Sequence, residues 1–269
     1  MLLIIEALLL ISAALGQDHR AAVEGQIFPL DMANNSVDDQ YDGCTREMTQ
    51  LVEKKYLKKE LNNSTNNFKI AWQEGQKNSK EPENNLTKNH SIAIYVYTGD
   101  KVFRDFNNET HYGKQNYTTE KYNWYSLHFL LTEAIQILKK TQNTCYETYR
   151  GTKFRYNFLN TKVRFGSFAS STFNRSKTKF FGTVSCFEIY TCEGAEVTKY
   201  SKLSHEREVL IPPYETFKVT SIRTKRDEKD LWCDTVYTLN NTGKTSDLNC
   251  ALFRRPNQTI DKYHVLHWA

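Results

Sequence analysis

The spacing of apolar residues changes at Cys145, and this change restricts the fold more than any other feature of the sequence. Before Cys145, apolar residues recur at steps of three and four, most regularly over residues 124–140, which is the spacing of an amphipathic helix. After Cys145, short runs rich in Tyr, Phe, Val and Thr are separated by glycines, as in strands joined by turns. Helices in the first half and strands in the second predict an α+β fold with segregated elements.

Several shorter elements are predicted within the helical half. The apolar spacing predicts helices over residues 45–61 and 68–76, and one or two helical turns over residues 101–107. The continuously apolar residues 92–97 indicate a strand or a buried segment. Residues 77–89 are rich in Asn, Lys and Glu and predict a loop.

The two ends of the chain predict a secreted protein. Residues 1–16 are almost wholly apolar and end in small residues before Gln17, as in a secretory signal peptide, and they are too few to span a membrane as a helix. No linker or repeat divides residues 17–269, so one domain is expected there. Residues 254–269 are polar and lack the apolar tail of a glycolipid anchor, so we expect a released, extracellular protein with no membrane span. Ten Asn-x-Ser/Thr sequons, which are typical of exported glycoproteins, begin at Asn34, Asn62, Asn63, Asn85, Asn89, Asn108, Asn116, Asn174, Asn240 and Asn257.

The cysteines indicate disulfides rather than a metal site. They form no Cys-x-x-Cys motif, and no His pair has the spacing of a zinc site, so we expect no bound metal. An even number of cysteines in an exported chain is typical of a disulfide framework, but the spacing alone leaves the pairing open. The six are Cys44, Cys145, Cys186, Cys192, Cys233 and Cys250.

The net charge of +5 comes from basic residues that are spread along the chain. The densest group, Lys54, Lys55, Lys58 and Lys59, has the spacing of the solvated face of a helix. This distribution argues against a nucleic-acid partner. A modest positive field still favours anionic ligands, including a dinucleotide.

Three segments of the β half carry residues suited to chemistry. The first is Arg150 before a glycine, the second is the hydroxyl run over residues 170–172, and the third places Glu206 and Glu208 at the start of an apolar strand. If one strand runs through both glutamates, their side chains point to the same face and can hold a cation or a cationic transition state. Taken singly, each segment has a simpler explanation, namely a surface ion pair, a strand edge or a solvated face.

The order of these segments is more specific than any one of them. Arg, then Ser-Ser-Thr, then Glu-x-Glu, on consecutive β segments of an exported, cysteine-rich chain, resembles the Arg-Ser-Glu signature of the ecto-mono-ADP-ribosyltransferases that act on arginine. The resemblance covers about residues 41–252, the expected core of the domain. It includes the words Tyr41-Asp42-Gly43-Cys44, Tyr97-Thr98-Gly99, His128-Phe129-Leu130-Leu131-Thr132-Glu133-Ala134, Tyr149-Arg150-Gly151-Thr152, Arg164-Phe165-Gly166, Phe187-Glu188-Ile189-Tyr190-Thr191-Cys192 and Glu208-Val209-Leu210-Ile211-Pro212-Pro213.

The resemblance implies a fold and a reaction. The fold is an N-terminal helical region packed on a C-terminal β-sandwich, with a cleft that binds NAD. The reaction transfers ADP-ribose from NAD, or from NADP, to arginine side chains of extracellular or cell-surface proteins and releases nicotinamide, without a metal. Two alternatives stay open: an NAD glycohydrolase, in which water replaces arginine, and an inactive glycosylated binding protein on the same fold.

The resemblance also implies roles for four residues. Glu208 holds the catalytic glutamate position, where an ionised carboxylate stabilises the cationic ribose of the transition state. Arg150 contacts the cofactor, and its guanidinium suits a pyrophosphate. Ser170 orients the nicotinamide side of NAD and supports Glu208. Glu206 holds the acceptor guanidinium, which is a poor nucleophile until it loses a proton, and accepts that proton.

Further NAD contacts are implied at Tyr97, Gly151, Ser167 and Ser201. Ser167 replaces a Gln that relatives often carry, which weakens the expectation of a contact there. In the loop before the glutamates, Leu203 and Ser204 replace the Phe-Pro of many relatives, a change that bears on the choice of acceptor. The same resemblance implies the disulfides Cys44–Cys250, which would tie the helical part to the last strand, and Cys145–Cys192, and it leaves Cys186 and Cys233 as the third pair.

Overall fold

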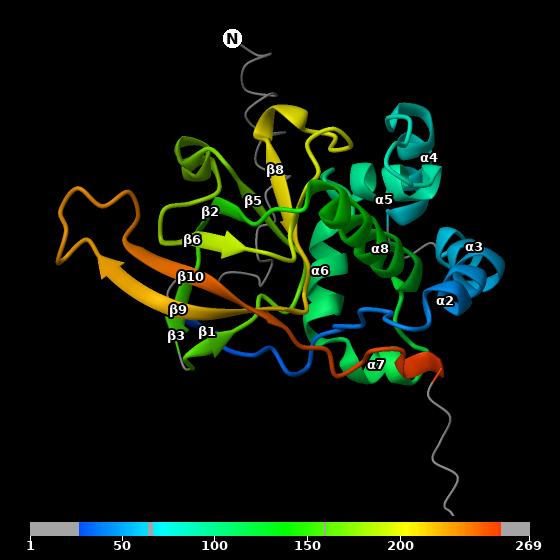
Figure 1. The fold of residues 1–269 in the computed structure, drawn as a ribbon, viewed down its shortest axis with the longest axis horizontal. Coiled ribbons are helices and arrows are strands. Elements are labelled where there is room, and N and C mark those ends of the chain that lie inside the picture. The colour runs from blue at the N-terminus through cyan, green and yellow to red at the C-terminus, as the bar shows by residue number, and fades with distance from the viewer. Residues whose placement is uncertain (1–26, 64–66, 159, 254–269) are drawn as a thin grey trace, which may run out of the picture.

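The computed structural model describes residues 27–63, 67–158 and 160–253. Figure 1 shows helices gathered on one side of the molecule and strands on the other, so the predicted α+β class is confirmed. The predicted signal peptide, the polar C-terminal residues and the sequon at Asn257 lie outside the described residues.

The helical half is built around its longest helix, α8. All six inner positions that the spacing predicts in α8, from Leu127 to Leu138, are buried. Residues 45–61 are helical throughout, as predicted, but a π-helical turn, η1, separates α2 from α3. The helical elements are α2 (Thr45–Leu51), η1 (Val52–Tyr56), α3 (Leu57–Leu61), α4 (Phe68–Asn78), α5 (Lys88–Tyr97), α6 (Phe103–Tyr112), α7 (Lys114–Thr118) and α8 (Tyr125–Gln142).

The apolar run at residues 92–97 is the second half of helix α5, so its interpretation as a strand is wrong, although the segment is buried. The helix begins with a capping box, in which the His90 backbone N–H donates to Thr87 Oγ1 and the Thr87 N–H donates to His90 Nδ1. A helix that is covered on every side needs no polar face, and a short apolar run without helical periodicity resembles a buried strand. The predicted loop is correspondingly shorter, and α6 is longer than the predicted turns.

The strands are hydrogen-bonded into one eight-stranded mixed sheet with the order β4-β9-β10-β6-β2-β5-β8-β7, and into a two-stranded parallel sheet of β1 and β3. Leu30 of β1 shares a hydrophobic core with residues of the larger sheet, so the two sheets pack against each other. The hairpin of β9 and β10 extends away from the rest of the molecule (Figure 1). The strands are β1 (Ile27–Leu30), β2 (Tyr146–Thr152), β3 (Arg155–Phe158), β4 (Lys162–Val163), β5 (Ala169–Thr172), β6 (Ser185–Thr191), β7 (Ala195–Glu196), β8 (Glu208–Ile211), β9 (Glu215–Thr224) and β10 (Thr235–Lys244).

Strands β5 and β8 lie between two hydrophobic cores. Phe168 and Leu210 belong to the core formed with the helices, whereas their neighbours Ala169 and Ile211 belong to the core among the strands. Side chains alternate along a strand, and Ser170 lies opposite Leu210 in the antiparallel pairing. Ser170 therefore faces the helical half, and Glu208, two residues before Leu210, faces the same way.

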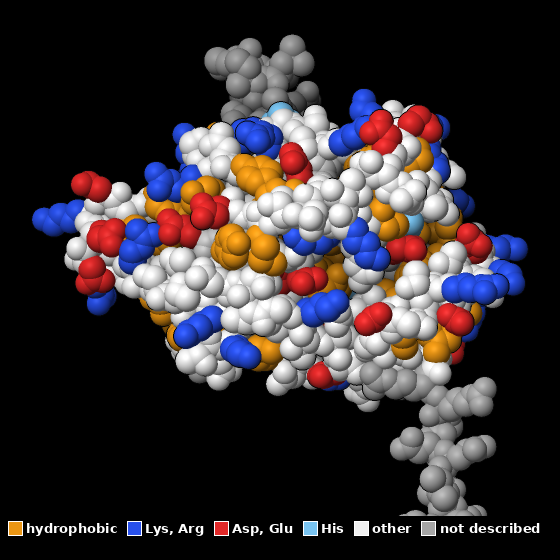
Figure 2. Space-filling view, viewed as in Figure 1, with side chains coloured by type: hydrophobic (Ala, Val, Ile, Leu, Met, Phe, Trp, Pro, Cys, Tyr) orange, Lys and Arg blue, Asp and Glu red, His pale blue; other side chains and the backbone are white. Residues whose placement is uncertain are grey.

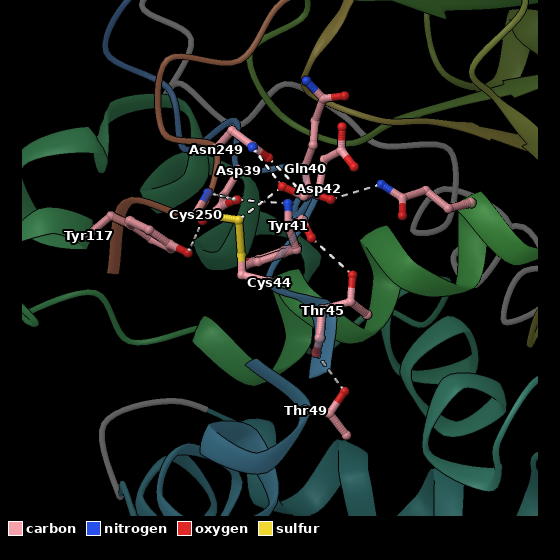
Figure 3. Close-up of a disulfide and its surroundings, with 11 residues drawn as sticks. Asp39, Gln40, Tyr41, Asp42, Cys44, Thr45, Thr49, Tyr117, Asn249 and Cys250 are labelled. Atoms are coloured by element: carbon pink, nitrogen blue, oxygen red, sulfur yellow. Dashed lines mark hydrogen bonds between the residues drawn. A yellow bond between two sulfur atoms is a disulfide. The ribbon is translucent and has the colours of Figure 1, made fainter. Parts of the chain in front are cut away.

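The three implied disulfides are all present. Cys44 joins the start of α2 to Cys250, which lies beyond β10 rather than on the last strand (Figure 3). The Asp39 carboxylate accepts hydrogen bonds from the backbone N–H groups of Tyr41 and Cys250 and from the Tyr117 hydroxyl. The Cys44–Cys250 disulfide and the Asp39 carboxylate together fasten both ends of the domain to the helical half.

Most of the sequon asparagines lie at the surface. Of the nine sequon asparagines within the described ranges, seven are exposed and two, Asn63 and Asn89, are half-buried. On the face drawn in Figure 2, basic and acidic side chains are interspersed rather than gathered in one block. None of the helices in the described ranges combines the length and the hydropathy of a membrane-spanning segment.

Replacing Arg164 by Ala is expected to lower the free energy of unfolding by about 3 to 5 kcal/mol, because Asp38 would remain as an unpaired buried charge. The Arg164 and Asp38 side chains are both 1% exposed, and Nη1 lies 2.6 Å from Oδ2. Arg164 also donates to the Met32 carbonyl, and Asp38 accepts from the Leu248 N–H. Denaturant unfolding of the oxidised protein measures the change.

The matched control is Lys162→Ala, two residues before Arg164 on the short strand β4 and exposed, which is expected to change stability by less than about 0.5 kcal/mol. A loss of less than about 1 kcal/mol in the Arg164 variant would show that the buried pair does not fasten the ends of the domain.

Candidate active site

Glu208 is the first residue of β8 and has no exposed surface. Ser201 Oγ donates to its Oε2 at 3.4 Å. Burial raises the pKa of Glu208 to about 7, although the Ser170 and Ser201 hydroxyls and the Arg150 charge oppose that rise. Its other oxygen, Oε1, has no hydrogen-bond partner among the described residues.

The Arg150 side chain connects strand β2 to strand β5. It lies on β2, is 5% exposed, and donates from Nη1 to the Ser170 carbonyl at 2.8 Å. Strands β2 and β5 pair only at Tyr149 and Thr172, so the guanidinium spans a place where the two backbones separate. Its Cζ lies 6.0 Å from the centre of the Phe165 ring.

The last turn of α5 reaches the same cluster through Tyr97. The buried hydroxyl of Tyr97 donates to the Phe168 carbonyl at 2.9 Å and accepts from Asn107 Nδ2 at 3.1 Å. Burial raises the pKa of Tyr97, the Glu208 charge raises it further, and the Arg150 charge lowers it. Tyr97 therefore brings the helical half into electrostatic contact with both charged groups.

Glu206 and Glu208 do not lie on one strand, so the predicted strand geometry is wrong. Glu206 ends the short 3-10 helix η3 (Ser204–Glu206), and Arg207 has a left-handed backbone with φ of 51°. The turn is fixed by Thr172, whose hydroxyl donates to the Glu206 carbonyl at 2.7 Å and whose Cα is paired with that of Glu208. A tight turn, rather than strand alternation, therefore buries both carboxylates.

The two carboxylates have unlike surroundings. Glu206 is 1% exposed, and neither of its carboxylate oxygens has a hydrogen-bond partner among the described residues. Burial and the nearby Glu208 raise the pKa of Glu206 to about 8, with Lys177 opposing. Glu208, by contrast, accepts a hydrogen bond from the Ser201 hydroxyl, and the Arg150 charge lowers its pKa. Two acids with different environments in one site are the arrangement that separates catalytic roles.

Comparison with protein families shows which family of proteins contains this chain. Residues 30–246 match the family model described as NAD:arginine ADP-ribosyltransferase. The chain belongs to this family. The matched range contains every residue of the cluster, from Tyr97 to Glu208. The protein is therefore an arginine ADP-ribosyltransferase with NAD as its co-substrate, and neither the glycohydrolase nor the inactive binding protein is favoured.

Relatives of this ADP-ribosyltransferase are found among ecto-enzymes. T-cell ecto-ADP-ribosyltransferase 1 of Mus musculus is 38% identical over 201 residues, which cover 71% of this chain and 68% of the relative. Ecto-ADP-ribosyltransferase 4 of Homo sapiens is 33% identical over 240 residues, which cover 83% of this chain and 73% of the relative.

Solved structures of the mono-ADP-ribosyltransferase ART2.2 have the same fold as this ADP-ribosyltransferase. One crystal form is 30% identical, has a TM-score of 0.69, and covers 83% of this chain and 98% of ART2.2. A mutant of ART2.2 in complex with NADH has a TM-score of 0.70 at the same identity and coverage. Across the described residues of this chain, no group of three or more His, Cys, Asp or Glu side chains could hold a metal ion.

The other residues that were expected to contact NAD differ in how closely they are connected to this cluster. Ser201 contacts Glu208, as described above, whereas Ser167 is buried without a hydrogen bond to the cluster among the described residues. Gly151 follows Arg150 and is required by packing, because a Cβ there would lie 2.5 Å from the Gly182 carbonyl oxygen.

One functional contact was not anticipated from the sequence. Lys202 donates from Nζ to Glu74 Oε1 at 2.7 Å, and its backbone N–H donates to Thr98 Oγ1 at 2.9 Å. These bonds fasten the loop that carries Ser201 to helices α4 and α5. The word Tyr97-Thr98-Gly99 was the available signal, but a contact across 104 residues leaves no local pattern.

Proposed function

We propose that Arg150, Ser170, Glu206 and Glu208 form the catalytic set of this arginine ADP-ribosyltransferase. The observation that supports this proposal is the turn at Arg207, which buries two carboxylates that are two positions apart in the sequence and have unlike surroundings. The oxygens that lack partners among the described residues, both of Glu206 and one of Glu208, are those that a substrate would satisfy.

Glu208 acts on the bond between nicotinamide and ribose. When that bond breaks, its electron pair leaves with nicotinamide and positive charge develops on the ribose ring. An ionised Glu208 that accepts a hydrogen bond from a ribose hydroxyl stabilises this cation more than it stabilises the ground state. Arg150 and the hydroxyls of Ser170 and Ser201 favour the ionised form of the carboxylate, and the Ser201 hydroxyl orients it.

Glu206 acts on the acceptor. A guanidinium is fully protonated at neutral pH and has no lone pair to attack with until a proton leaves. A carboxylate with two uncommitted oxygens can bind it in a paired geometry and accept that proton as nitrogen bonds to the ribose carbon. The products are the arginine adduct, nicotinamide and a proton.

The remaining expected residues surround NAD. Arg150 would bind the pyrophosphate of NAD or NADP, and Tyr97, Gly151, Ser167 and Ser201 would line the nucleotide. Ser201 is the best supported of these because it already donates to Glu208. The pyrophosphate carries the negative charge that a partly buried guanidinium recognises.

We further propose that residues 1–16 are removed on export and that residues 17–269 form one secreted transferase domain with its core at about residues 41–252. Three disulfides and the ecto-enzyme relatives support an extracellular location. The acceptors would be extracellular or cell-surface proteins with accessible arginines. N-terminal sequencing of the protein recovered from culture medium, compared with the membrane fraction, tests export and release.

Incubation with NAD and agmatine, a small guanidinium compound, tests the reaction itself. We expect a stable ADP-ribosyl-agmatine adduct and free nicotinamide in equal amounts, detected by mass spectrometry and chromatography. Free ADP-ribose without the adduct would make the protein a glycohydrolase. No consumption of NAD would leave only the inactive binding protein.

A further inference from the structure

A groove of about 820 Å³ lies beside the turn that carries the two glutamates. We name it the basic groove. Six of its lining residues are important here: Arg175, Lys179, Arg207, Tyr149, Phe173 and Trp232. Arg175 and Lys179 come from the 3-10 helix η2 (Arg175–Phe180), and Trp232 comes from the segment between β9 and β10. The groove thus joins three separate parts of the strand half.

All the charged side chains that line the basic groove are positive. Arg175, Lys179 and Arg207 are exposed, none of them forms an ion pair with another described residue, and no carboxylate lines the groove. The nearby Glu188 is already paired with Arg223 at 2.7 Å. Three cations without counter-charges create a local positive potential that attracts an anionic partner.

Aromatic rings hold two of these cations in place. Arg207 Cζ lies 5.3 Å from the centre of the Phe173 ring, and Arg175 Cζ lies 6.0 Å from the Trp232 ring. A guanidinium that stacks on a ring keeps its N–H donors at its edge, where they remain available to carboxylate oxygens. Two of the three cations of the groove therefore lie within reach of an aromatic ring and are exposed to an incoming anion.

The basic groove and the acceptor carboxylate belong to one turn. Arg207 lies between the buried Glu206 and Glu208 and is itself exposed, so its side chain leaves the turn toward solvent. Thr172 donates to the Glu206 carbonyl and accepts from the Asn174 backbone N–H, and Lys177 Nζ donates to the His205 carbonyl. Arg207 and η2 therefore lie next to the turn that carries Glu206, where the chain around an acceptor arginine would come close to them.

We propose that the basic groove selects acceptor arginines that have aspartate or glutamate residues close by in the acceptor chain. This inference rests on the proposed function of Glu206. The partner is an acidic segment of the acceptor protein, bound by charge complementarity while its arginine enters the buried site. The pyrophosphate of NAD is also an anion, but the proposed function assigns it to the buried Arg150. The experiment distinguishes an acidic acceptor segment from the pyrophosphate as the occupant of the groove.

The test compares two synthetic peptides of equal length, each with a single arginine, flanked in one by glutamates and in the other by serines and glutamines. The full mature protein is treated with an endoglycosidase, because Asn174, which lines the groove, is a sequon asparagine. The variant is Arg175→Glu/Lys179→Glu. The matched control, Lys58→Glu/Lys69→Glu, makes the same charge change at exposed residues of α3 and α4.

The parent and the control are expected to modify the acidic peptide with a kcat/KM about tenfold above that of the neutral peptide, as for two exposed ion pairs. This preference should shrink as salt is added. The Arg175→Glu/Lys179→Glu variant should lose the preference but keep the parent values for agmatine transfer and for the KM of NAD.

Two results would overturn the inference: equal use of both peptides by the parent, or a raised KM for NAD in the groove variant with agmatine as acceptor. The second result would assign the groove to the phosphates of NAD. Failure of the parent to modify agmatine at all would instead contradict the proposed function, so the two failures are distinguishable.

Discussion

Replacing Glu208 by Gln is expected to lower the turnover of NAD by about a thousandfold, with or without an acceptor. Gln has nearly the same shape and still accepts a hydrogen bond, but it carries no charge to set against the cationic ribose. The measurement is release of nicotinamide from NAD under single-turnover conditions. Because both transfer and hydrolysis pass through the same cation, both should fall together.

Loss of folding does not explain such a result. Burial raises the pKa of Glu208 to about 7 from an ordinary value of 4.5, so the folded state binds the proton more tightly than the unfolded state. The stability that the protonated group contributes is therefore lost as the pH rises from 4.5 toward 7. At neutral pH the Gln variant should be at least as stable as the parent in thermal unfolding. An inactive variant that unfolds early would leave the role of the charge unsupported.

Replacing Glu206 by Gln is expected to lower transfer to agmatine by about a hundredfold or more, while the hydrolysis of NAD stays within about threefold of the parent. Hydrolysis involves no guanidinium, so it does not need Glu206 as a base. Transfer needs a base because the acceptor guanidinium must lose a proton. The adduct and free ADP-ribose are measured in the same reaction. The same loss in both products would mean that Glu206 acts on the ribose and not on the acceptor.

The pH dependence separates the two carboxylates further. Both must be ionised to act, so activity rises with pH. The kcat/KM for NAD in hydrolysis should rise through about 7, the raised pKa of Glu208, and transfer should need a further rise through about 8, the raised pKa of Glu206. In the Glu206→Gln variant the step near 8 should be absent. A profile for the variant that matches the parent would remove Glu206 as the base.

The fold was predictable where local patterns are strong. Helix α8 has a long amphipathic repeat and a polar C-terminal end, and its inner positions followed directly from the spacing. Residues 92–97 of helix α5 were ambiguous because all of them except the half-buried Tyr95 are buried, so this run has no polar face from which a period of 3.6 could be recognised. The disulfide pairing followed from the resemblance alone, since cysteine spacing does not determine which distant segments meet.

The candidate site was predictable in its members but not in its geometry. Glu206 and Glu208 were expected on one strand, yet Arg207 adopts a left-handed backbone that its residue type does not signal, since Gly, Asn and Asp are the usual indicators. Contacts such as that of Tyr97 with Phe168 join residues 71 positions apart. Such contacts are set by how the two halves pack, and no local pattern encodes them.

The position of β5 and β8 between the two cores has a consequence for how substrates come and go. Phe168 and Ala169, where β5 begins, and Leu210 and Ile211 within β8, belong to the two different cores, so rocking of the helical half against the strand half as rigid bodies would disrupt packing in both. Access to the buried carboxylates then depends on local loop movement. We expect the segment between β7 and β8, which carries Ser201, to be the part that moves, and its bonds from Lys202 to Glu74 and Thr98 hold it to α4 and to the end of α5.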